Sequence, residues 1–534
     1  MRRPLSLAAL IGIVGACGAA LAQDQATVTV TNTTTAEFRI DNKNGRAEDD
    51  NFGLLLNRLN LSGTSGQIAT QLRLDTVYFP DETLFFPNPP SPTFRDDARL
   101  ERLTVRYSLG DWTLTAGDFY RQVGRGIALS IRKVDEAGLD VTLRGGDLQW
   151  ESDDHRLGVF AGLTNPVNID TISQSFIEDT DDIVVGSDWE YLGLDIVNVG
   201  LYAVFVHPSE RLLPGQRDFT FSEGITLSSP GLTDWLSIYA ELGAQRTQLA
   251  GAVTTGRGVG DTILANAFAA YMAVDMNFSE IGPGDVILLL EALALDDYEV
   301  KGSRNSSLGS RFDYNFAPTL ERIDQEVFDN TDVRGARARL EYAIPDPELV
   351  FFANSMVRIN HLDEPGQVEM FHNYGGFDLG WQEGISRVVI SAGARREVSD
   401  EVTFKAINHV EVDLTQHIGA GFSLHIASNV EDRLLDETKF LRGSTFLGGD
   451  IQDLGGLTFE FGYDTQDPSP EVRNLFFAGI LALDLGALIG DEVVEGVDLR
   501  ATVGTQRGGI KCISGVCREF PAFAGGRLEI VGRF

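Results

Sequence analysis

Histidine is the side chain most often used for metal binding and proton transfer near neutral pH, and this sequence contains few of them. The seven are His155, His207, His361, His372, His409, His417 and His425. They form neither a His-Glu-x-x-His motif nor a mixed Cys–His cluster. His409 and His417 lie eight positions apart on the charged side of one alternating stretch, which favours ordinary polar positions. We therefore predict no metal site.

Motifs for a nucleophile or a cofactor are also missing from the sequence. Ser, His and Asp are plentiful, but no spacing selects a catalytic set, and Gly-x-Ser-x-Gly does not occur. Gly124-Arg125-Gly126 lacks the third glycine and the following helix of a dinucleotide-binding fingerprint. We predict that the protein is not an enzyme and uses no cofactor.

The spacing of the cysteines indicates a structural disulfide and neither a redox-active pair nor a metal site. Cys512 and Cys517 are separated by four residues, whereas a redox-active pair has two between its cysteines, and no histidine lies near them to complete a metal site. In an oxidising compartment such a pair forms a disulfide. We predict a Cys512–Cys517 disulfide that closes a small loop.

The charge balance is strongly acidic. Lys and Arg total 43 against 78 Asp and Glu, which gives a formal net charge of -35. Nucleic acid is excluded as a partner, because phosphate binding needs a basic face. Acidic surface loops could hold divalent cations, and adaptation to a salty habitat explains the same composition.

The N-terminus has the features of an export signal. Arg2 and Arg3 precede the apolar segment Leu5–Val14, and Ala20-Leu21-Ala22 is a small-x-small cleavage site. We predict that residues 1–22 are a signal peptide. A lipobox at Val14–Cys17, with Cys17 acylated, is the alternative. Elsewhere no apolar run approaches the roughly 20 residues of a membrane helix.

From about residue 50 onward, polar and apolar residues alternate with a period of two. In Arg102–Leu109, Leu103 and Val105 oppose Arg102 and Arg106, and Leu457–Asp464 repeats the pattern. The apolar sides mix Ala, Gly and Thr with aromatics, which suits lipid contact better than the core of a soluble sandwich. We predict an all-β fold in which residues 23–534 form a single large antiparallel transmembrane β-barrel of about 22–26 strands in the cell outer membrane.

The last stretch, Pro521–Phe534, alternates in the same way and ends on Phe534. It resembles the final strand of Gram-negative outer-membrane barrels, whose terminal aromatic residue is read by the barrel-assembly machinery. This machinery and outer-membrane lipids are therefore the expected partners. Long extracellular loops are expected at about 80–98, 165–187, 301–334 and 509–520.

The side of the barrel on which each turn lies constrains residues 120–138. If Leu109-Gly110-Asp111 and Glu151–Asp154 are periplasmic turns, only one extracellular excursion can separate them. Tyr120–Gly138 would then be an inserted segment that folds over the mouth or into the lumen. Its bend would lie at a possible constriction formed by Gly124, Arg125 and Gly126. One extra hairpin is the alternative.

The polar sides of the strands indicate a charged lumen, which suggests two functions. The first is a porin-like channel for small or anionic solutes. The second is a non-conducting surface scaffold or adhesin whose acidic loops bind partners or divalent cations. The residues predicted to line the lumen are Arg73, Arg102, Arg106, Arg144, Arg337, Arg339, Arg500, Glu411 and Asp413.

Several segments together resemble an uncharacterised family of predicted bacterial outer-membrane β-barrel proteins. They are Gly117–Tyr120 (GDFY), Gly124–Leu129 (GRGIAL), Leu143–Gly146 (LRGG), Gln506–Gly509 (QRGG), Gly515–Arg518 (GVCR) and Pro521–Phe523 (PAF). The resemblance implies a fold and a location. It implies no activity and no ligand residues.

Overall fold

The fold is taken from a computed structural model, and almost every element in it is a strand. It describes residues 26–43, 50–80, 96–134, 138–169, 177–210, 217–249, 263–304, 311–321, 331–362, 364–467, 469, 472–486, 496–513, 516–520 and 522–534. The predicted signal peptide lies outside these residues. Among them, no helix has the length and apolar character needed to cross a bilayer.

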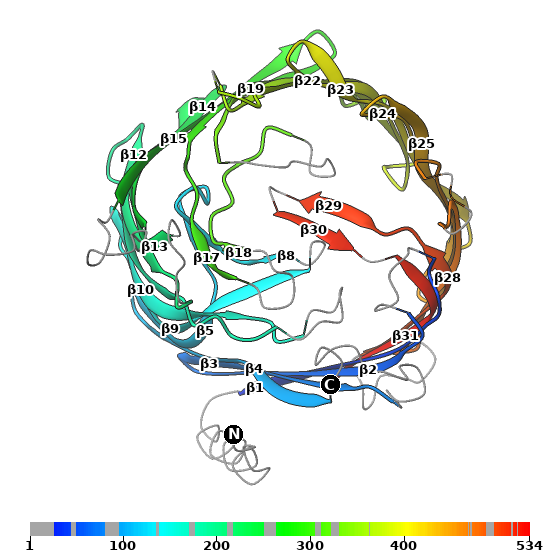
Figure 1. The fold of residues 1–534 in the computed structure, drawn as a ribbon, viewed down its shortest axis with the longest axis horizontal. Coiled ribbons are helices and arrows are strands. Elements are labelled where there is room, and N and C mark those ends of the chain that lie inside the picture. The colour runs from blue at the N-terminus through cyan, green and yellow to red at the C-terminus, as the bar shows by residue number, and fades with distance from the viewer. Residues whose placement is uncertain are drawn as a thin grey trace, which may run out of the picture.

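Twenty-four antiparallel strands form the wall of one closed barrel (Figure 1). The wall strands are β1 (Thr27–Arg39), β2 (Gly53–Ser65), β3 (Ile68–Tyr78), β4 (Asp97–Leu109), β5 (Trp112–Phe119), β9 (Leu139–Glu151), β10 (His155–Pro166), β11 (Ile183–Tyr191), β12 (Asn198–His207), β13 (Arg217–Thr233), β14 (Leu236–Leu249), β15 (Ile263–Ile281), β16 (Gly284–Asp296), β19 (Val333–Ile344), β20 (Leu349–Asn360), β21 (Val368–Trp381), β22 (Ser386–Ser399), β23 (Val402–Gly419), β24 (Phe422–Leu435), β25 (Thr438–Ile451), β26 (Gly455–Asp464), β27 (Leu475–Asp484), β28 (Gly496–Gln506) and β31 (Phe523–Arg533).

Seven short strands are inserted between wall strands. They are β6 (Arg121–Val123), β7 (Leu129–Ile131), β8 (Lys133–Val134), β17 (Lys301–Arg304), β18 (Arg311–Asp313), β29 (Gly509–Ile513) and β30 (Val516–Phe520).

The first and last strands close the barrel. β1 pairs with β31 from Thr31↔Arg533 to Arg39↔Gly525, and β31 pairs on its other side with β28. Phe534 exchanges two backbone hydrogen bonds of 2.9 Å with Val30. Closure leaves no strand edge, as a membrane-spanning sheet requires. The prediction of an antiparallel barrel of 22–26 strands is confirmed.

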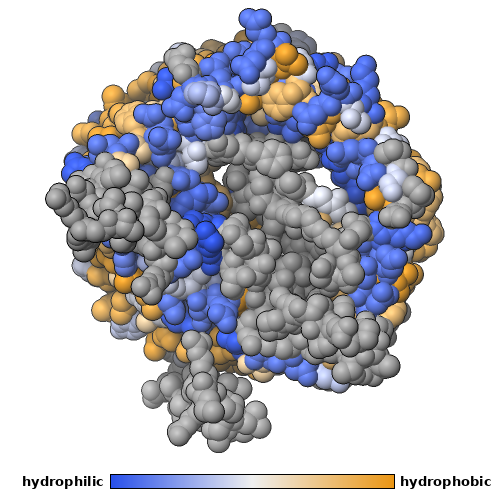
Figure 2. Space-filling model, viewed as in Figure 1, coloured by the Kyte–Doolittle hydropathy of each residue, from blue (hydrophilic) through white to orange (hydrophobic). Residues whose placement is uncertain are grey.

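Side chains alternate between the two faces of the wall. In β27, Leu475 and Phe477 are exposed on the outside, whereas Phe476 and Ala478 are buried on the inside. Figure 2 shows hydrophobic residues on the outer wall and hydrophilic residues around the barrel opening. An apolar exterior on a closed sheet is typical of a transmembrane β-barrel of the outer-membrane type.

The strand order places both chain ends at one end of the barrel. The tight turns at 110–111 and 152–154 lie at that same end, so only one excursion to the opposite end separates β5 from β9. β5 pairs directly with β9, from Trp112↔Trp150 to Phe119↔Leu143. Residues 120–138 are therefore inserted between neighbouring wall strands and are not a further hairpin of the wall.

Two inserted segments fill one side of the interior. The first segment is residues 120–134. The second comprises residues 297–304 and 311–321. Val123, Leu129 and Ile131 of the first segment pack against wall residues in one core cluster, and Tyr298 and Leu320 of the second do so in another. The segments also bond to each other, because Ser130 donates to the Tyr314 carbonyl (2.7 Å) and Phe316 to that of Gly126 (2.9 Å).

Removing Phe534 is expected to lower the yield of assembled barrel sharply. The deletion removes both backbone hydrogen bonds to Val30 at the closing seam and the terminal aromatic residue. Assembly can be measured in cells as the fraction of chain with heat-modifiable gel mobility. Phe477→Ala, which truncates an exposed aromatic residue of the outer wall, serves as the control. Equal assembly of the deletion and the control would contradict the expected role of the last residue.

Candidate functional site

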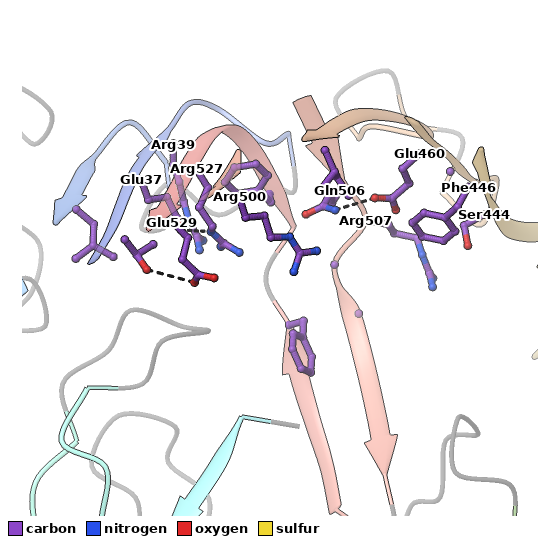
Figure 3. Close-up of a pocket in the computed structure, with 18 of the residues that line it drawn as sticks. Glu37, Arg39, Ser444, Phe446, Glu460, Arg500, Gln506, Arg507, Arg527 and Glu529 are labelled. Carbon is purple, nitrogen blue, oxygen red and sulfur yellow. Dashed lines mark hydrogen bonds and ion pairs between the residues drawn. The ribbon is translucent and has the colours of Figure 1, made fainter. Parts of the chain in front are cut away.

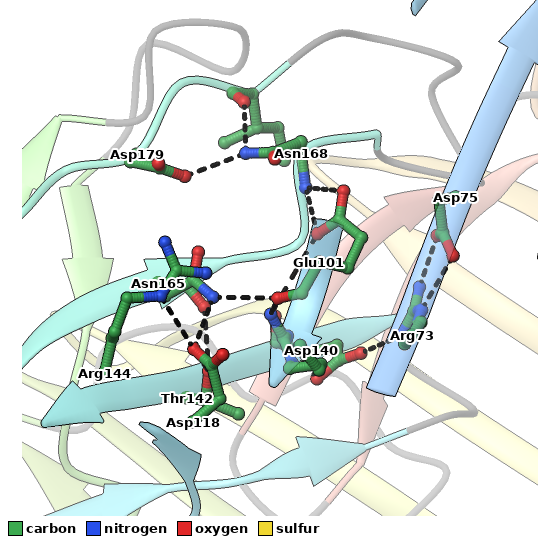
Figure 4. Close-up of polar contacts among 12 residues, drawn as sticks. Arg73, Asp75, Glu101, Asp118, Asp140, Thr142, Arg144, Asn165, Asn168 and Asp179 are labelled. Carbon is green, nitrogen blue, oxygen red and sulfur yellow. Dashed lines mark hydrogen bonds and ion pairs between the residues drawn. The ribbon is translucent and has the colours of Figure 1, made fainter. Parts of the chain in front are cut away.

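A buried network joins the wall to the base of the first inserted segment (Figure 4). The Arg73 guanidinium donates to Asp75 (2.7 Å) and Asp140 (2.8 Å), and Arg102 donates to the other Asp140 oxygen (2.8 Å). The hydroxyl of Tyr120 also donates to Asp140 (2.8 Å). Arg73 and Arg102 are each only 8% exposed. They point inward as predicted, but they do not line open space, because they are buried against Asp75 and Asp140 in this network.

Next to this network, the carboxylate of Asp118 is the acceptor for three further hydrogen-bond donors. It accepts hydrogen bonds from Leu103 N (2.8 Å), Asn165 Nδ2 (2.8 Å) and Arg144 Nε (3.2 Å). The Arg144 side chain remains 46% exposed. In the β9–β10 ladder Arg144 pairs with Leu163, an exposed residue of the outer wall, whereas the neighbouring Leu143 packs into the interior core cluster. Arg144 therefore lies on the outer face of the wall, so its predicted place in the lumen is wrong, and Asp118 compensates its charge.

The tip of the first segment turns inside the barrel at Gly124-Arg125-Gly126. Gly124 and Gly126 both have positive φ, and a Cβ on Gly124 would lie 2.5 Å from a Glu241 carboxylate oxygen. The Arg125 amide donates to that carboxylate (2.8 Å), and its guanidinium lies 4.6 Å from the Tyr239 ring centroid. The glycines thus let the backbone approach the wall, while Arg125 stays beside the cavity.

The second segment is held by one carboxylate. Asp182, which is fully buried, accepts hydrogen bonds from Tyr314 Oη (2.6 Å), Ser303 N (2.8 Å) and Ser209 N (2.8 Å), and also from Ser303 Oγ. Burial, and after it the negative charge of Asp182, raise the pKa of Tyr314 well above its usual value. The phenol therefore remains a hydrogen-bond donor at physiological pH.

A histidine pair holds the end of the same segment. His372 Nδ1 lies 2.7 Å from Glu321, and His372 Nε2 lies 3.0 Å from His409 Nε2. Both rings are buried, and His409 Nδ1 faces Glu411 at 3.3 Å. These histidines connect the inserted segment to β21 and β23.

The open part of the lumen contains a cavity of about 950 Å³ beside the inserted segments. Arg125, Arg337 and Arg339 border it, together with Glu291 and Glu341. Arg337 pairs with Glu291, and Arg339 pairs with Glu341 at 2.5 Å. The charges of this cavity are therefore largely compensated, by one ion pair between β16 and β19 and one within β19.

A second cavity of about 620 Å³ lies under the closing seam (Figure 3). Glu37 is shared by Arg39 and Arg527, while Glu460 accepts from Gln506 (2.7 Å). Figure 3 shows the Arg500 guanidinium pointing into the cavity. No ion pair joins Arg500 to any carboxylate among the described residues. Five arginines and three glutamates line this cavity: Arg39, Arg58, Arg500, Arg507, Arg527, Glu37, Glu460 and Glu529.

The remaining predicted lumen residues are dispersed. Glu411 borders the 950 Å³ cavity and a smaller one of about 270 Å³, which Asp413 also lines. Asp413 faces His425 at 3.3 Å. Arg106 is exposed on the inner side near the end that holds the termini, with no ion pair among the described residues. The predicted lumen residues therefore do not form one continuous row of arginines along the lumen.

The long loops differ from the expected extracellular arrangement. The described part of 301–334 packs into the barrel up to residue 321, and Asp182 in the 165–187 loop is buried. β29 and β30 reach across the interior in Figure 1. A barrel this wide has room for inserted chain, and apolar residues of the second inserted segment are buried there. Most of the 80–98 loop lies outside the described residues.

For the predicted disulfide, the structure gives only the backbone positions of the two cysteines. Cys512 and Cys517 are direct partners across the β29–β30 hairpin. The structure does not describe their side chains, so the disulfide remains a prediction.

Comparisons with known proteins give only distant likenesses. No family model and no curated protein matches the chain. Pseudomonas aeruginosa OccK1 (OpdK) is 13% identical with a TM-score of 0.40, covering 73% of this chain and 97% of that one. OccK2 (OpdF) of the same organism, solved in complex with glucuronate, is 14% identical with a TM-score of 0.37, covering 73% and 96%. The P. aeruginosa siderophore receptor PirA is 8% identical with a TM-score of 0.47, covering 95% and 80%. Because these TM-scores lie below 0.5, we infer fold and function from the chain's own strands and side chains.

Proposed function

We propose that this protein is a porin-like channel of the outer membrane that passes small anionic solutes along the open side of its lumen. The observation that carries the proposal is the excess of arginine around the 620 Å³ cavity, where five guanidinium groups meet three carboxylates. Fixed positive charge in a pore wall lowers the energy of an anion relative to a cation. Arg500, which has no ion pair among the described residues, contributes most directly.

The shape of the lumen supports a selective channel over a wide pore. One side is occupied by the inserted segments. The 950 Å³ cavity lies between these segments and the wall, and the 620 Å³ cavity lies under the closing seam. Figure 2 shows openings beside the wall. A solute would therefore travel along a narrow charged surface, where side chains can discriminate by charge and size.

A non-conducting scaffold is the second candidate. The buried Arg73–Asp140–Arg102 network and the filled half of the lumen favour it, because paired charges and packed loops close space. Bilayer conductance of the purified chain separates the two. Absence of conductance would eliminate the channel proposal and leave the scaffold.

Arg500→Glu is expected to lower the anion-to-cation permeability ratio several-fold, because it replaces the most available positive charge of the cavity with a negative one. The measurement is the reversal potential in a salt gradient across a planar bilayer. Arg102 is unsuitable for this test, because it is buried against Asp140 and its replacement would disturb packing.

Arg246→Glu is the matched control. Arg246 carries the same charge but lies on the exposed outer side of β14, between the buried Gln245 and Thr247. The control should keep the wild-type reversal potential. An unchanged reversal potential in Arg500→Glu would contradict the role of this cavity in anion passage.

A further inference from the structure

Three potential metal ligands meet at the barrel end opposite the chain termini. Asp332 directly precedes β19, while His361 and Glu364 follow β20. One ligand atom from each residue, a ring nitrogen or a carboxylate oxygen, lies within 4.8 Å of the other two. These residues belong to neither cavity and to neither buried network described above.

The backbone brings the three residues together. The β19–β20 ladder ends at Val333↔Asn360, which makes Asp332 and His361 neighbours across the strand pair. The His361 amide donates to the Asp332 carbonyl (3.3 Å), and the Glu364 amide donates to the His361 carbonyl (3.0 Å). The chain therefore positions the three side chains before any ligand binds.

Burial is graded across the cluster. The Asp332 side chain is only 10% exposed, and its carboxylate lies 3.3 Å from His361 Nδ1. His361 is partly exposed and Glu364 is exposed. The cluster is thus closed on the Asp332 side and open to solvent on the Glu364 side, which leaves room for water to complete a coordination sphere.

The donor set selects the class of ion. One imidazole and two carboxylates suit a divalent transition metal such as Zn²⁺, whereas Ca²⁺ prefers six to eight oxygen ligands. Tetrahedral Zn²⁺ with bonds of roughly 2.0–2.1 Å places its ligand atoms about 3.4 Å apart. The separation of 3.3 Å between His361 Nδ1 and Asp332 Oδ2 already matches this value. A divalent ion would also neutralise the two carboxylates.

We propose that Asp332, His361 and Glu364 bind one divalent transition-metal ion, for which Zn²⁺ is the best match. The site joins the residue that precedes β19 to the loop that follows β20, which the backbone hydrogen bond from His361 to Asp332 already connects. Thr331, next to Asp332, accepts a hydrogen bond of 2.9 Å from the amide of Tyr298, which is fully buried in the second inserted segment. Bound metal therefore fastens the point at which β19 begins to the β20–β21 loop.

The test is Zn²⁺ titration of the full-length, chelator-treated protein in detergent, followed by calorimetry, with Co²⁺ absorption as a spectroscopic probe. Wild type is expected to bind one Zn²⁺ per chain at this site. His361→Ala and Glu364→Gln should each weaken binding by at least about tenfold. Heat-modifiable gel mobility verifies that each variant is folded.

His207→Ala is the matched control. His207 also lies at the end of a wall strand, beside Asp218 at 3.9 Å, but it belongs to no three-ligand group among the described residues. It should bind Zn²⁺ as wild type does. Equal binding by folded His361→Ala and wild type would overturn the proposal. Displacement of Zn²⁺ by equimolar Ca²⁺ would also overturn it, because it would indicate an oxygen-only acidic site.

Discussion

Replacing residues 121–137 with a two-residue turn is expected to raise single-channel conductance several-fold. The replacement removes Val123, Ile127 and Leu129, which are almost completely buried inside the barrel. The wall remains continuous, because β5 and β9 pair directly as far as Phe119↔Leu143. Conductance increases with the open cross-section of a pore, so emptying part of the lumen should be visible in planar bilayers.

A milder variant tests the same segment without deleting its packing. Gly124→Val places a branched side chain at a residue of positive φ, where even a Cβ would lie 2.5 Å from Glu241. It should displace the tip of the segment and give a smaller rise in conductance. The same two-residue turn in place of residues 465–474 is the control, since the described residues of that loop belong to neither interior cluster. If both segment variants conduct as wild type does, the first segment does not limit ion flow.

The alternation of polar and apolar residues predicts the wall well, because a strand between lipid and water repeats every two residues whatever its neighbours are. The same local rule places the inserted segment. The two tight turns at 110–111 and 152–154 leave only one excursion between them, and this is the strand order of the structure. These features depend on adjacent residues, so they can be derived from the sequence alone.

The alternating pattern does not predict which inward-facing residues of the wall are buried and which face a cavity. Arg73, Arg102 and Arg500 have the same inward position in the alternating pattern, yet the first two are buried in ion pairs and the third faces a cavity. The difference arises from Asp140 of β9, which pairs with both Arg73 and Arg102, whereas no carboxylate among the described residues pairs with Arg500. Alternation identifies the face of a strand, but not what lies in front of it.

The buried carboxylates were missed for a related reason. Asp182 and Tyr314 are separated by 132 positions, and their contact depends on how far the second inserted segment reaches into the lumen. Asp182 belongs to a stretch with several acidic residues, which by composition indicates a solvated loop. The only local signal is that the apolar residues Ile183 and Val184 follow it directly at the start of β11.

Asp182→Ala is expected to cost about 3–5 kcal/mol of folding free energy and to loosen the second inserted segment. The carboxylate accepts hydrogen bonds from Ser209, Ser303 and Tyr314 in a fully buried position. Its removal leaves several buried donors without an acceptor, and each such donor costs about 1–3 kcal/mol before relaxation. The free energy can be measured by urea titration of the protein in lipid vesicles, and segment motion by added noise in single-channel recordings.

Asp181→Asn separates this effect from a general loss of charge. Asp181 is adjacent in sequence and carries the same group, but it is exposed, and asparagine tolerates its positive φ of 53°, so the replacement should change the folding free energy by less than about 0.5 kcal/mol. Tyr314→Phe removes one donor and leaves the other hydrogen bonds of Asp182 in place, so about 1 kcal/mol is expected. The effects should decrease in the order Asp182→Ala, Tyr314→Phe, Asp181→Asn, because Asp182 is the shared acceptor. If Asp181→Asn and Asp182→Ala had equal effects, charge alone would matter, and the inserted segment would be held by its apolar contacts.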